Sequence, residues 1–207
     1  MRDLGVIILA AGKGKRMGGD HPKVLTKLGE EPLIDYIITT ALSLNPSLIA
    51  VVVGFEKQLV MEYISNKFVD TNLNRNSIDS GLKTPDGTEV RYATQDEQLG
   101  TGHAVQQTKD IFENFKDNIV LLYGDAPLIS KATIQNLIDH HDKTGAAATI
   151  LSAEYDDPFG YGRVIRDDSG ELLKIIEEKD ASLKEKAILE VNTGTYVFRA
   201  EQLFDNL

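Results

Sequence analysis

The first two thirds of the sequence alternate short apolar runs with segments of helical periodicity. The apolar runs have the length of strands and cover residues 6–10, 48–53, 90–94, 119–123 and 146–151. Helical patterns lie between them, at residues 33–44, about 56–68, 101–115 and 134–141. This alternation is typical of βαβ units, whose right-handed crossovers place successive strands parallel in one sheet. We therefore expect an α/β fold with a Rossmann-like, mostly parallel sheet and helices on both faces.

The pattern changes after Tyr155. Three further strands are expected at residues 163–166, 172–177 and 190–198, with a turn at 167–170 and little helix between them. We interpret residues 1–150 as a core and residues 151–207 as a smaller, β-rich lobe of the same domain. The polar, turn-rich residues 70–87 are expected to form a long surface insertion.

Charge and cysteine content exclude several classes of function. The 207 residues carry a formal net charge of -10, so the surface as a whole should repel nucleic acid and anionic membranes. The chain has no cysteine, which excludes disulfides, thiolate metal sites and a cysteine nucleophile. The apolar run at residues 5–11 is far short of the roughly 20 residues that cross a bilayer, and no cleavage site follows it. We expect a cytoplasmic protein with neither a nucleic-acid nor a membrane partner.

Positive charge gathers in the segment that follows the first strand. Between Arg2 and Lys27 the chain has six basic and two acidic residues, together with Gly12, Gly14, Gly18 and Gly19. Glycines allow the backbone N–H groups to approach an anion, which predicts a phosphate-bearing ligand at this end of the strand. Neither a dinucleotide fingerprint nor a Walker loop fits, because Met17 and Arg16 stand where those motifs need Gly and Ser or Thr. A glycine-rich turn with solvated lysines is the alternative.

An acidic side chain follows a later strand directly. Asp125 lies in the sequence Tyr123-Gly124-Asp125, after the apolar residues 119–123. It is a candidate Mg²⁺ ligand beside the phosphate loop, since Mg²⁺ takes one or two carboxylates together with phosphate oxygens and water. The alternative is an aspartate that caps a turn.

The segment from Gln95 to His103 has two interpretations. Its amide side chains and glycine backbone could read the edge of a nucleobase, or it could be an ordinary helix entry with Thr101 as the N-cap. The four histidines have no spacing that converges on zinc, and no Gly-x-Ser-x-Gly elbow occurs. We therefore expect the histidines to be structural or surface residues.

Several motifs occur together in one order along the chain. Their sequences are LAAGKGKRM at 9–17, PKVL at 22–25, EQLGTGHA at 97–104, YGD at 123–125, DPFGYGR at 157–163, EEKD at 177–180 and EVNTG at 190–194. The first two resemble the signature of sugar-phosphate nucleotidyltransferases. Together the motifs resemble the uridyltransferase domain of the bacterial bifunctional N-acetylglucosamine-1-phosphate uridyltransferase/glucosamine-1-phosphate acetyltransferases, a domain of the GT-A type.

This resemblance implies a role for each matched residue. Leu9, Ala10, Ala11 and Gly12 would line the nucleotide, with Arg16 and Lys23 on its phosphates. Gln95 and Gly100 would read uracil, with Thr101 nearby, and Asp125 would bind Mg²⁺. The sugar would contact Tyr123, Gly124, Gly162, Glu177 and Asn192.

The implied reaction is the transfer of UMP from UTP to N-acetylglucosamine 1-phosphate, with catalysis by Arg16, Lys23 and Asp125. A phosphate oxygen of the sugar would attack the α-phosphorus of UTP in line, releasing pyrophosphate. The alternatives are a nucleotidyltransferase for another sugar or alcohol phosphate and a non-catalytic nucleotide-sugar binding module.

The chain departs from the family in three places. Lys15 stands where Thr or Ser is usual, and the insertion at 70–87 is longer than expected. The acetyltransferase β-helix and a further Mg²⁺-binding asparagine are absent, so we expect a domain truncated at its C-terminus and favour a monomer.

Overall fold

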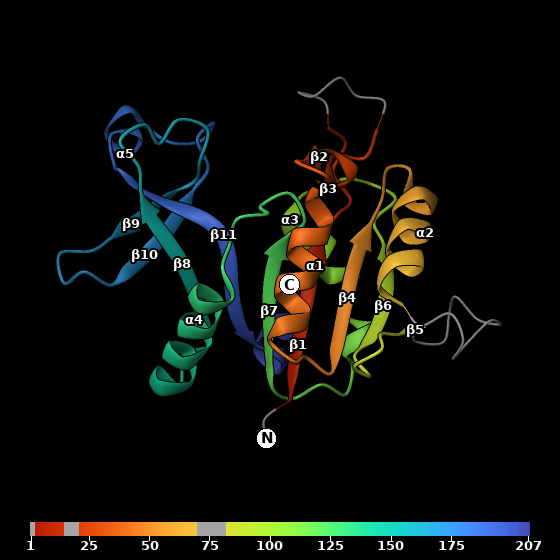
Figure 1. Ribbon diagram of the computed structural model, residues 1–207. Helices are drawn as coiled ribbons and strands as arrows, with labels where there is room; N and C mark the ends of the chain where they lie inside the picture. The colour runs from red at the N-terminus through yellow and green to blue at the C-terminus, as the bar shows by residue number, and fades with distance from the viewer. Residues whose placement is uncertain (1–2, 15–20, 70–81) are drawn as a thin grey trace.

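The structure is a computed structural model that describes residues 3–14, 21–69 and 82–207 (Figure 1). Arg16 and Lys15 lie outside the described residues, as does the part of the expected insertion between residues 70 and 81.

The main sheet has nine strands within the described residues. Eight follow the order β10-β9-β11-β7-β1-β4-β6-β5, and β8 pairs with β11 beside this path. These strands are β1 (Leu4–Leu9), β4 (Leu48–Val53), β5 (Leu82–Lys83), β6 (Glu89–Thr94), β7 (Asn118–Tyr123), β8 (Ala148–Glu154), β9 (Arg163–Arg166), β10 (Leu172–Ile176) and β11 (Glu190–Arg199). The central strands β7, β1, β4 and β6 are parallel, which confirms the expected α/β architecture. The remaining pairings, on both flanks, are antiparallel.

Helices cover both faces of the parallel strands (Figure 1). The helices are α1 (Leu33–Ser43), α2 (Lys57–Phe68), α3 (Thr101–Gln106), α4 (Lys131–Thr144), α5 (Leu183–Lys186) and α6 (Ala200–Asp205). One buried cluster joins α1, α2 and α4 to one face of the sheet, and a second joins α3 and α6 to the other. Neighbouring residues of a strand therefore enter different clusters, as Ile7 and Ile8 of β1 do. Burial on both faces explains why these strands are continuous apolar runs.

The expected continuous helix at 101–115 is wrong. The helix α3 ends at Gln106, and a separate 3-10 helix covers Asp110–Phe112. The hydroxyl of Thr108 donates to the carbonyl of Val105 at 2.7 Å, so the side chain uses a helical acceptor where the α-helix stops. The 3-10 turn then places Phe112, which is 2% exposed, in the core.

The elements β8, β9, β10 and α5 lie together at the left of Figure 1, in the part of the chain expected to form the smaller lobe. The long strand β11 connects it to the core. Residues Tyr196 to Arg199 of β11 pair with β7, whereas Val191 pairs with Arg163 of β9. The register against β8 shifts between Asn192 and Thr195, so β11 carries a bulge between its two partners. The division at residue 150 stays a prediction, and that position falls inside β8.

Candidate functional site

The site lies where the carboxyl ends of the parallel strands meet. The N–H of Gly124 donates to the Leu9 carbonyl at 2.9 Å, and the N–H of Gln95 donates to the Val53 carbonyl at 2.8 Å. The start of the loop after β7 is therefore held against β1, and the start of the loop after β6 is held against β4, just beyond the strand pairing. In open α/β sheets this edge is the usual place for a ligand.

A cavity of about 360 Å³ opens between these loops. Nine residues with a predicted role line it: Leu9, Ala11, Gly12, Lys23, Gln95, Gly100, Thr101, Tyr123 and Asp125. Ala10 is 1% exposed and is packed beneath the cavity rather than lining it. The structure thus brings the residues predicted to bind nucleotide together at one place, apart from Arg16, which lies outside the described residues.

Two of the lining residues form an ion pair. The ammonium group of Lys23 contacts Oδ2 of Asp125, and their side chains are 40% and 27% exposed. Lys23 begins the 3-10 helix Lys23–Leu25, which follows Pro22, and Asp125 follows the end of β7. The cavity therefore offers a cation to bind phosphate and a carboxylate to bind a metal ion.

Gln95 also lines the cavity and is 5% exposed. Its Nε2 donates to the carbonyl of Gly100 at 3.0 Å and lies 3.2 Å from Nδ1 of His103. Gly100 has a φ of 112°, which favours glycine, and it is the N-cap of α3. The alternative with Thr101 as the cap is therefore wrong, since Thr101 is the first residue of the helix.

Gln98 also lines this cavity; it is the second amide of the segment 95–103, and it was not singled out as a site residue. Its Nε2 donates to the carbonyl of Ala11 at 2.6 Å, which joins the loop after β6 to the loop after β1. The available signal was its place three residues after Gln95, but this spacing did not show which of the two amides contacts the loop after β1.

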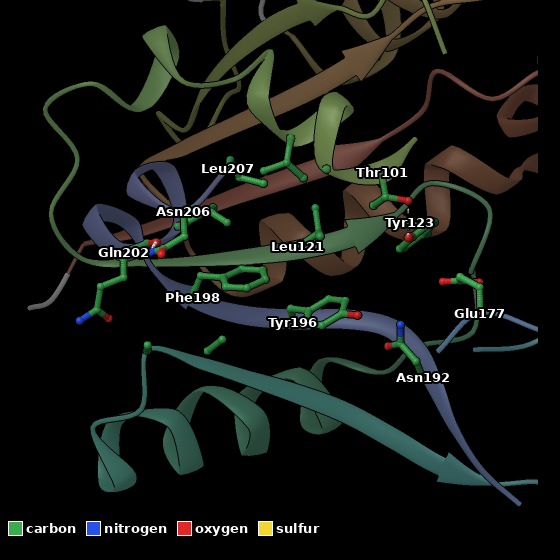
Figure 2. A pocket seen from close by; sticks show the side chains of 15 residues that line it. Thr101, Leu121, Tyr123, Glu177, Asn192, Tyr196, Phe198, Gln202, Asn206 and Leu207 are labelled. Carbon is green, nitrogen blue, oxygen red and sulfur yellow. Dashed lines mark hydrogen bonds between the residues drawn. The ribbon is translucent and has the colours of Figure 1, made fainter. Parts of the chain in front are cut away.

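A second cavity, of about 780 Å³, adjoins the first, and Thr101 and Tyr123 line both (Figure 2). Glu177 and Asn192 of the predicted sugar site line it from the smaller lobe. Gly162 and Gly124 are buried and do not line either cavity. The Gly162 carbonyl accepts a hydrogen bond from the N–H of Asn192 at 2.8 Å, so Gly162 supports this wall from behind.

Tyr123 stands between the two cavities. Its hydroxyl lies 3.2 Å from the Thr101 hydroxyl, as Figure 2 shows. Burial raises the pKa of Tyr123, and the carboxylates of Glu177 and Asp125 act in the same direction. The phenol therefore stays protonated and can donate a hydrogen bond to a ligand.

A glycine in the bulge of β11 makes room for this tyrosine. Gly194 has a φ of 81°, and a Cβ atom there would lie 2.5 Å from the Tyr123 ring. The N–H of Gly194 donates to Oδ1 of Asn192 at 3.0 Å. The bulge thus positions Asn192 and Tyr123 together.

The sequence analysis also missed the aromatic part of the larger cavity. Tyr196 and Phe198 stack with ring centroids 5.3 Å apart and line it beside Leu121 and Leu203. Their alternate positions in one strand place them on the same face, and that spacing was the available signal.

The geometry agrees with a comparison against known families. Residues 6–191 match the family model described as a MobA-like NTP transferase domain. The chain belongs to this family of nucleotidyltransferases.

The relatives of this MobA-like domain include much longer proteins. It is 40% identical over 201 residues to the "Bifunctional protein GlmU" of Streptococcus gordonii, covering 97% of this chain and 39% of that protein. It is 42% identical over 205 residues to the protein of the same name from Pelotomaculum thermopropionicum, covering 99% of this chain and 40% of that protein. The chain thus spans about two fifths of the length of these curated relatives and matches their N-terminal region.

Solved structures share the fold of this NTP transferase domain. A putative glucose-1-phosphate thymidylyltransferase from Bacillus anthracis superposes with a TM-score of 0.72 at 20% identity, covering 96% of this chain and 72% of that one. HddC from Yersinia pseudotuberculosis, solved with GMP-PN, gives a TM-score of 0.69 at 19% identity, covering 97% and 79%.

Two features are absent from the described part of this NTP transferase domain. Residues 3–14, 21–69 and 82–207 contain no cluster of three or more His, Asp or Glu side chains able to hold a metal ion. None of the helices in the same ranges is long and apolar enough to cross a membrane.

Proposed function

We propose that the chain transfers UMP from UTP to N-acetylglucosamine 1-phosphate and releases pyrophosphate. The observation that carries this proposal is the Lys23–Asp125 pair in a cavity that adjoins, at Thr101 and Tyr123, a second cavity lined by Glu177 and Asn192. One cavity suits a nucleoside triphosphate and the other a sugar. The motif resemblance and the GlmU relatives support the choice of uridine and of the N-acetylated sugar.

The nucleotide would lie in the smaller cavity. Leu9, Ala10, Ala11 and Gly12 would lie along the nucleotide, and Gln95, Gly100 and Thr101 would surround uracil. Lys23 would bind the phosphates, together with Arg16, which lies outside the described residues. Among these, the seven residues other than Ala10 and Arg16 line that cavity.

The sugar phosphate would enter from the larger cavity. Tyr123, Glu177 and Asn192 line it, the Gly162 carbonyl accepts from the N–H of Asn192, and Gly124 directly follows Tyr123. A phosphate oxygen of the sugar would form a bond to the α-phosphorus of UTP while the bond from the α-phosphorus to the bridging oxygen breaks. Pyrophosphate leaves with that oxygen. This reaction needs positioning and charge neutralisation rather than a covalent intermediate.

The residues present fit a magnesium ion in kind. Asp125 places a carboxylate, 27% exposed, in the cavity proposed for the phosphates. Mg²⁺ accepts one or two carboxylates and completes its shell with phosphate oxygens and water. When bound there, the ion would neutralise charge on the transferred phosphate. Asp125 would hold it, while Lys23 would turn from Asp125 to the phosphates.

We further propose that the protein works in the cytoplasm as a monomer on these small-molecule substrates. The net charge of -10 supports the absence of a nucleic-acid partner. Light scattering after size exclusion would test the oligomeric state.

The direct test is pyrophosphate release with Mg²⁺, measured with ATP, GTP, CTP, UTP and dTTP against a panel of sugar 1-phosphates. We expect turnover with UTP and N-acetylglucosamine 1-phosphate above every other combination. Turnover with a different sugar would reassign the larger cavity. Binding of UTP without pyrophosphate release under any combination would instead favour a nucleotide-sugar binding module.

A further inference from the structure

The smaller lobe contains one arginine that is almost entirely buried. Arg163 is the first residue of β9 and is 2% exposed, and it is the largest fully buried side chain among the described residues. A buried guanidinium group is unfavourable unless its charge and its N–H groups are matched. Its two Nη atoms have partners, whereas its Nε has none among the described residues.

Three oxygen atoms surround this guanidinium group. Its Nη2 donates to Oε2 of Glu178 at 2.7 Å and to the carbonyl of Lys186 at 3.4 Å, and Nη1 donates to the carbonyl of Tyr161. Oε2 of Glu178 also accepts from the N–H of Gly160 at 3.4 Å. The hydrogen bond from Arg163 lowers the pKa of Glu178, so the carboxylate is charged at neutral pH. The pair ties the loop before β9 to the segment after β10.

Each member of this pair is next to a residue of the proposed sugar site. Arg163 follows Gly162, and Glu178 follows Glu177. A Cβ atom on Gly162 would lie 3.5 Å from Oε1 of Glu177, so these two neighbours are also in contact range. Glu177 lines the larger cavity, whereas Glu178 reaches Arg163.

The third sugar residue is tied to the same point. Val191 pairs with Arg163 in the sheet, and the N–H of Asn192 donates to the Gly162 carbonyl at 2.8 Å. Glu177, Gly162 and Asn192 come from three separate segments of the chain. The Arg163–Glu178 pair lies behind them, where the three segments meet.

We propose that Arg163 and Glu178 are positioning residues that fix Glu177 and Asn192 for binding of the sugar phosphate. This inference rests on the proposed function. The pair does not line either cavity, so it acts through its neighbours and not by contact with substrate. Its effect falls on the sugar phosphate and not on the nucleotide, whose cavity is formed by the loops of the core.

The test compares substrate affinities in variants of Glu178, whose side chain is 22% exposed and tolerates replacement better than Arg163. We expect Glu178→Ala to raise the KM for N-acetylglucosamine 1-phosphate about tenfold, the scale of losses when a supporting partner of a site residue is removed. The KM for UTP and kcat should stay near their original values. Glu178→Gln should raise the sugar KM less, because the amide oxygen still accepts from Arg163 but lacks the charge.

Lys174→Ala is the matched control. Lys174 forms an ion pair with Glu185 at 2.7 Å in the same lobe, away from the cavity linings. Its removal should leave both KM values unchanged. Calorimetric titration of the Glu178 variants should show a raised Kd for N-acetylglucosamine 1-phosphate and an unchanged Kd for UTP.

Each outcome decides the inference. A sugar KM unchanged in Glu178→Ala would overturn it, as would a parallel rise in both KM values, which indicates general loss of structure. The same sugar KM rise in Lys174→Ala would also overturn it. Inactivity of the unaltered chain on this sugar would overturn the proposed function, and this inference with it. A selective rise that is reduced in Glu178→Gln supports the positioning role.

Discussion

The ammonium group of Lys23 contacts the carboxylate of Asp125 across 102 residues of sequence. The contact connects the short helix after the first loop with the end of β7, and it lies in the wall of the smaller cavity. Two opposite charges that are partly exposed in one cavity are available to exchange partners when a charged ligand enters. Both residues therefore give direct tests of the proposed reaction.

Lys23→Ala should lower kcat/KM by the equivalent of about 2–4 kcal/mol, the usual loss when one preorganised electrostatic donor is removed. The measurement is steady-state pyrophosphate release with UTP and N-acetylglucosamine 1-phosphate. Lys57→Ala is a matched control, because Lys57 also forms an ion pair, with Asp96 at 3.1 Å, is similarly exposed at 38%, and lies outside the cavity linings. Near-normal turnover in Lys23→Ala would remove Lys23 from the catalytic set.

Asp125→Ala should lose the turnover that depends on Mg²⁺, because the proposed metal ligand is removed. The rate is measured as Mg²⁺ is increased, and Asp96→Ala is the control, since Asp96 is 80% exposed and pairs with Lys57. If Asp125→Ala showed the same Mg²⁺ dependence as the unaltered chain, Asp125 would not be the ligand.

Gln95→Ala should reduce the preference for UTP over CTP. Gln95 is 5% exposed in the cavity wall, and a buried polar site discriminates strongly against a mismatched partner. The ratio of kcat/KM for the two nucleotides is the measurement. Gln107→Ala is the control, because Gln107 contacts His103 from a position that does not line the cavity. An unchanged ratio in Gln95→Ala would show that another residue reads the base.

Gly194→Ala should destabilise the fold by about 1–3 kcal/mol, through a left-handed backbone and overlap with the Tyr123 ring. Gly170→Ala separates these two causes. Gly170 has a φ of 87°, close to the 81° of Gly194, but has no heavy atom within 4 Å of an added Cβ. Urea denaturation should therefore show a smaller loss of unfolding free energy for Gly170→Ala. Equal losses would mean that the ring moves aside without cost.

Stability should fall as the pH is lowered below 6.5 because of His141. Burial lowers the pKa of His141 from its ordinary value of 6.5, with Arg199 acting in the same direction. As the pH falls, the imidazole of His141 therefore takes up a proton more readily in the unfolded chain than in the folded chain. The contribution of neutral His141 to the free energy of unfolding is fully present above pH 6.5 and is lost as the pH falls below it. Glutamates with a lowered pKa, such as Glu178, begin to lose their contribution to stability only when the pH falls below 4.5, the ordinary pKa of the side chain.

The measurement is the urea midpoint of unfolding at several pH values in this window. His141→Asn should remove most of the slope, because the amide does not titrate there. His140→Asn is the matched control at an exposed neighbour. A slope that survives in His141→Asn would assign the effect to another group.

The sequence correctly predicted those helices and strands that are determined by the hydrophobic pattern of their own residues. The strand expected at 48–53 matches β4, since all six of its residues are apolar and buried. The helix expected at 33–44 differs from α1 by one residue. The helix expected at 101–115 failed because the hydroxyl of Thr108 competes for a backbone carbonyl, a contact that periodicity does not show.

The location of the candidate site could be predicted from the sequence, but some of its supporting contacts could not. Loops that follow parallel strands were expected at one sheet edge, and the cavity lined by Lys23, Gln95 and Asp125 lies there. The roles of these residues stay predictions. The Arg163–Glu178 pair and the contact of Gln98 with Ala11 were not foreseen, because both depend on how separate loops fold back on each other.

The strand β11 is shared by several neighbours: β7 pairs with its residues 196–199, β9 pairs with Val191, and β8 pairs with residues on both sides of Gly194. Two parts of a chain that are joined by a loop can move independently, but two parts that share a strand must move with it. Because β8 pairs with β11 both before and after the bulge, β8 holds the two halves of that strand in one register. The sheet itself therefore sets the spacing between Asn192, before the bulge, and the residues of β11 that pair with β7.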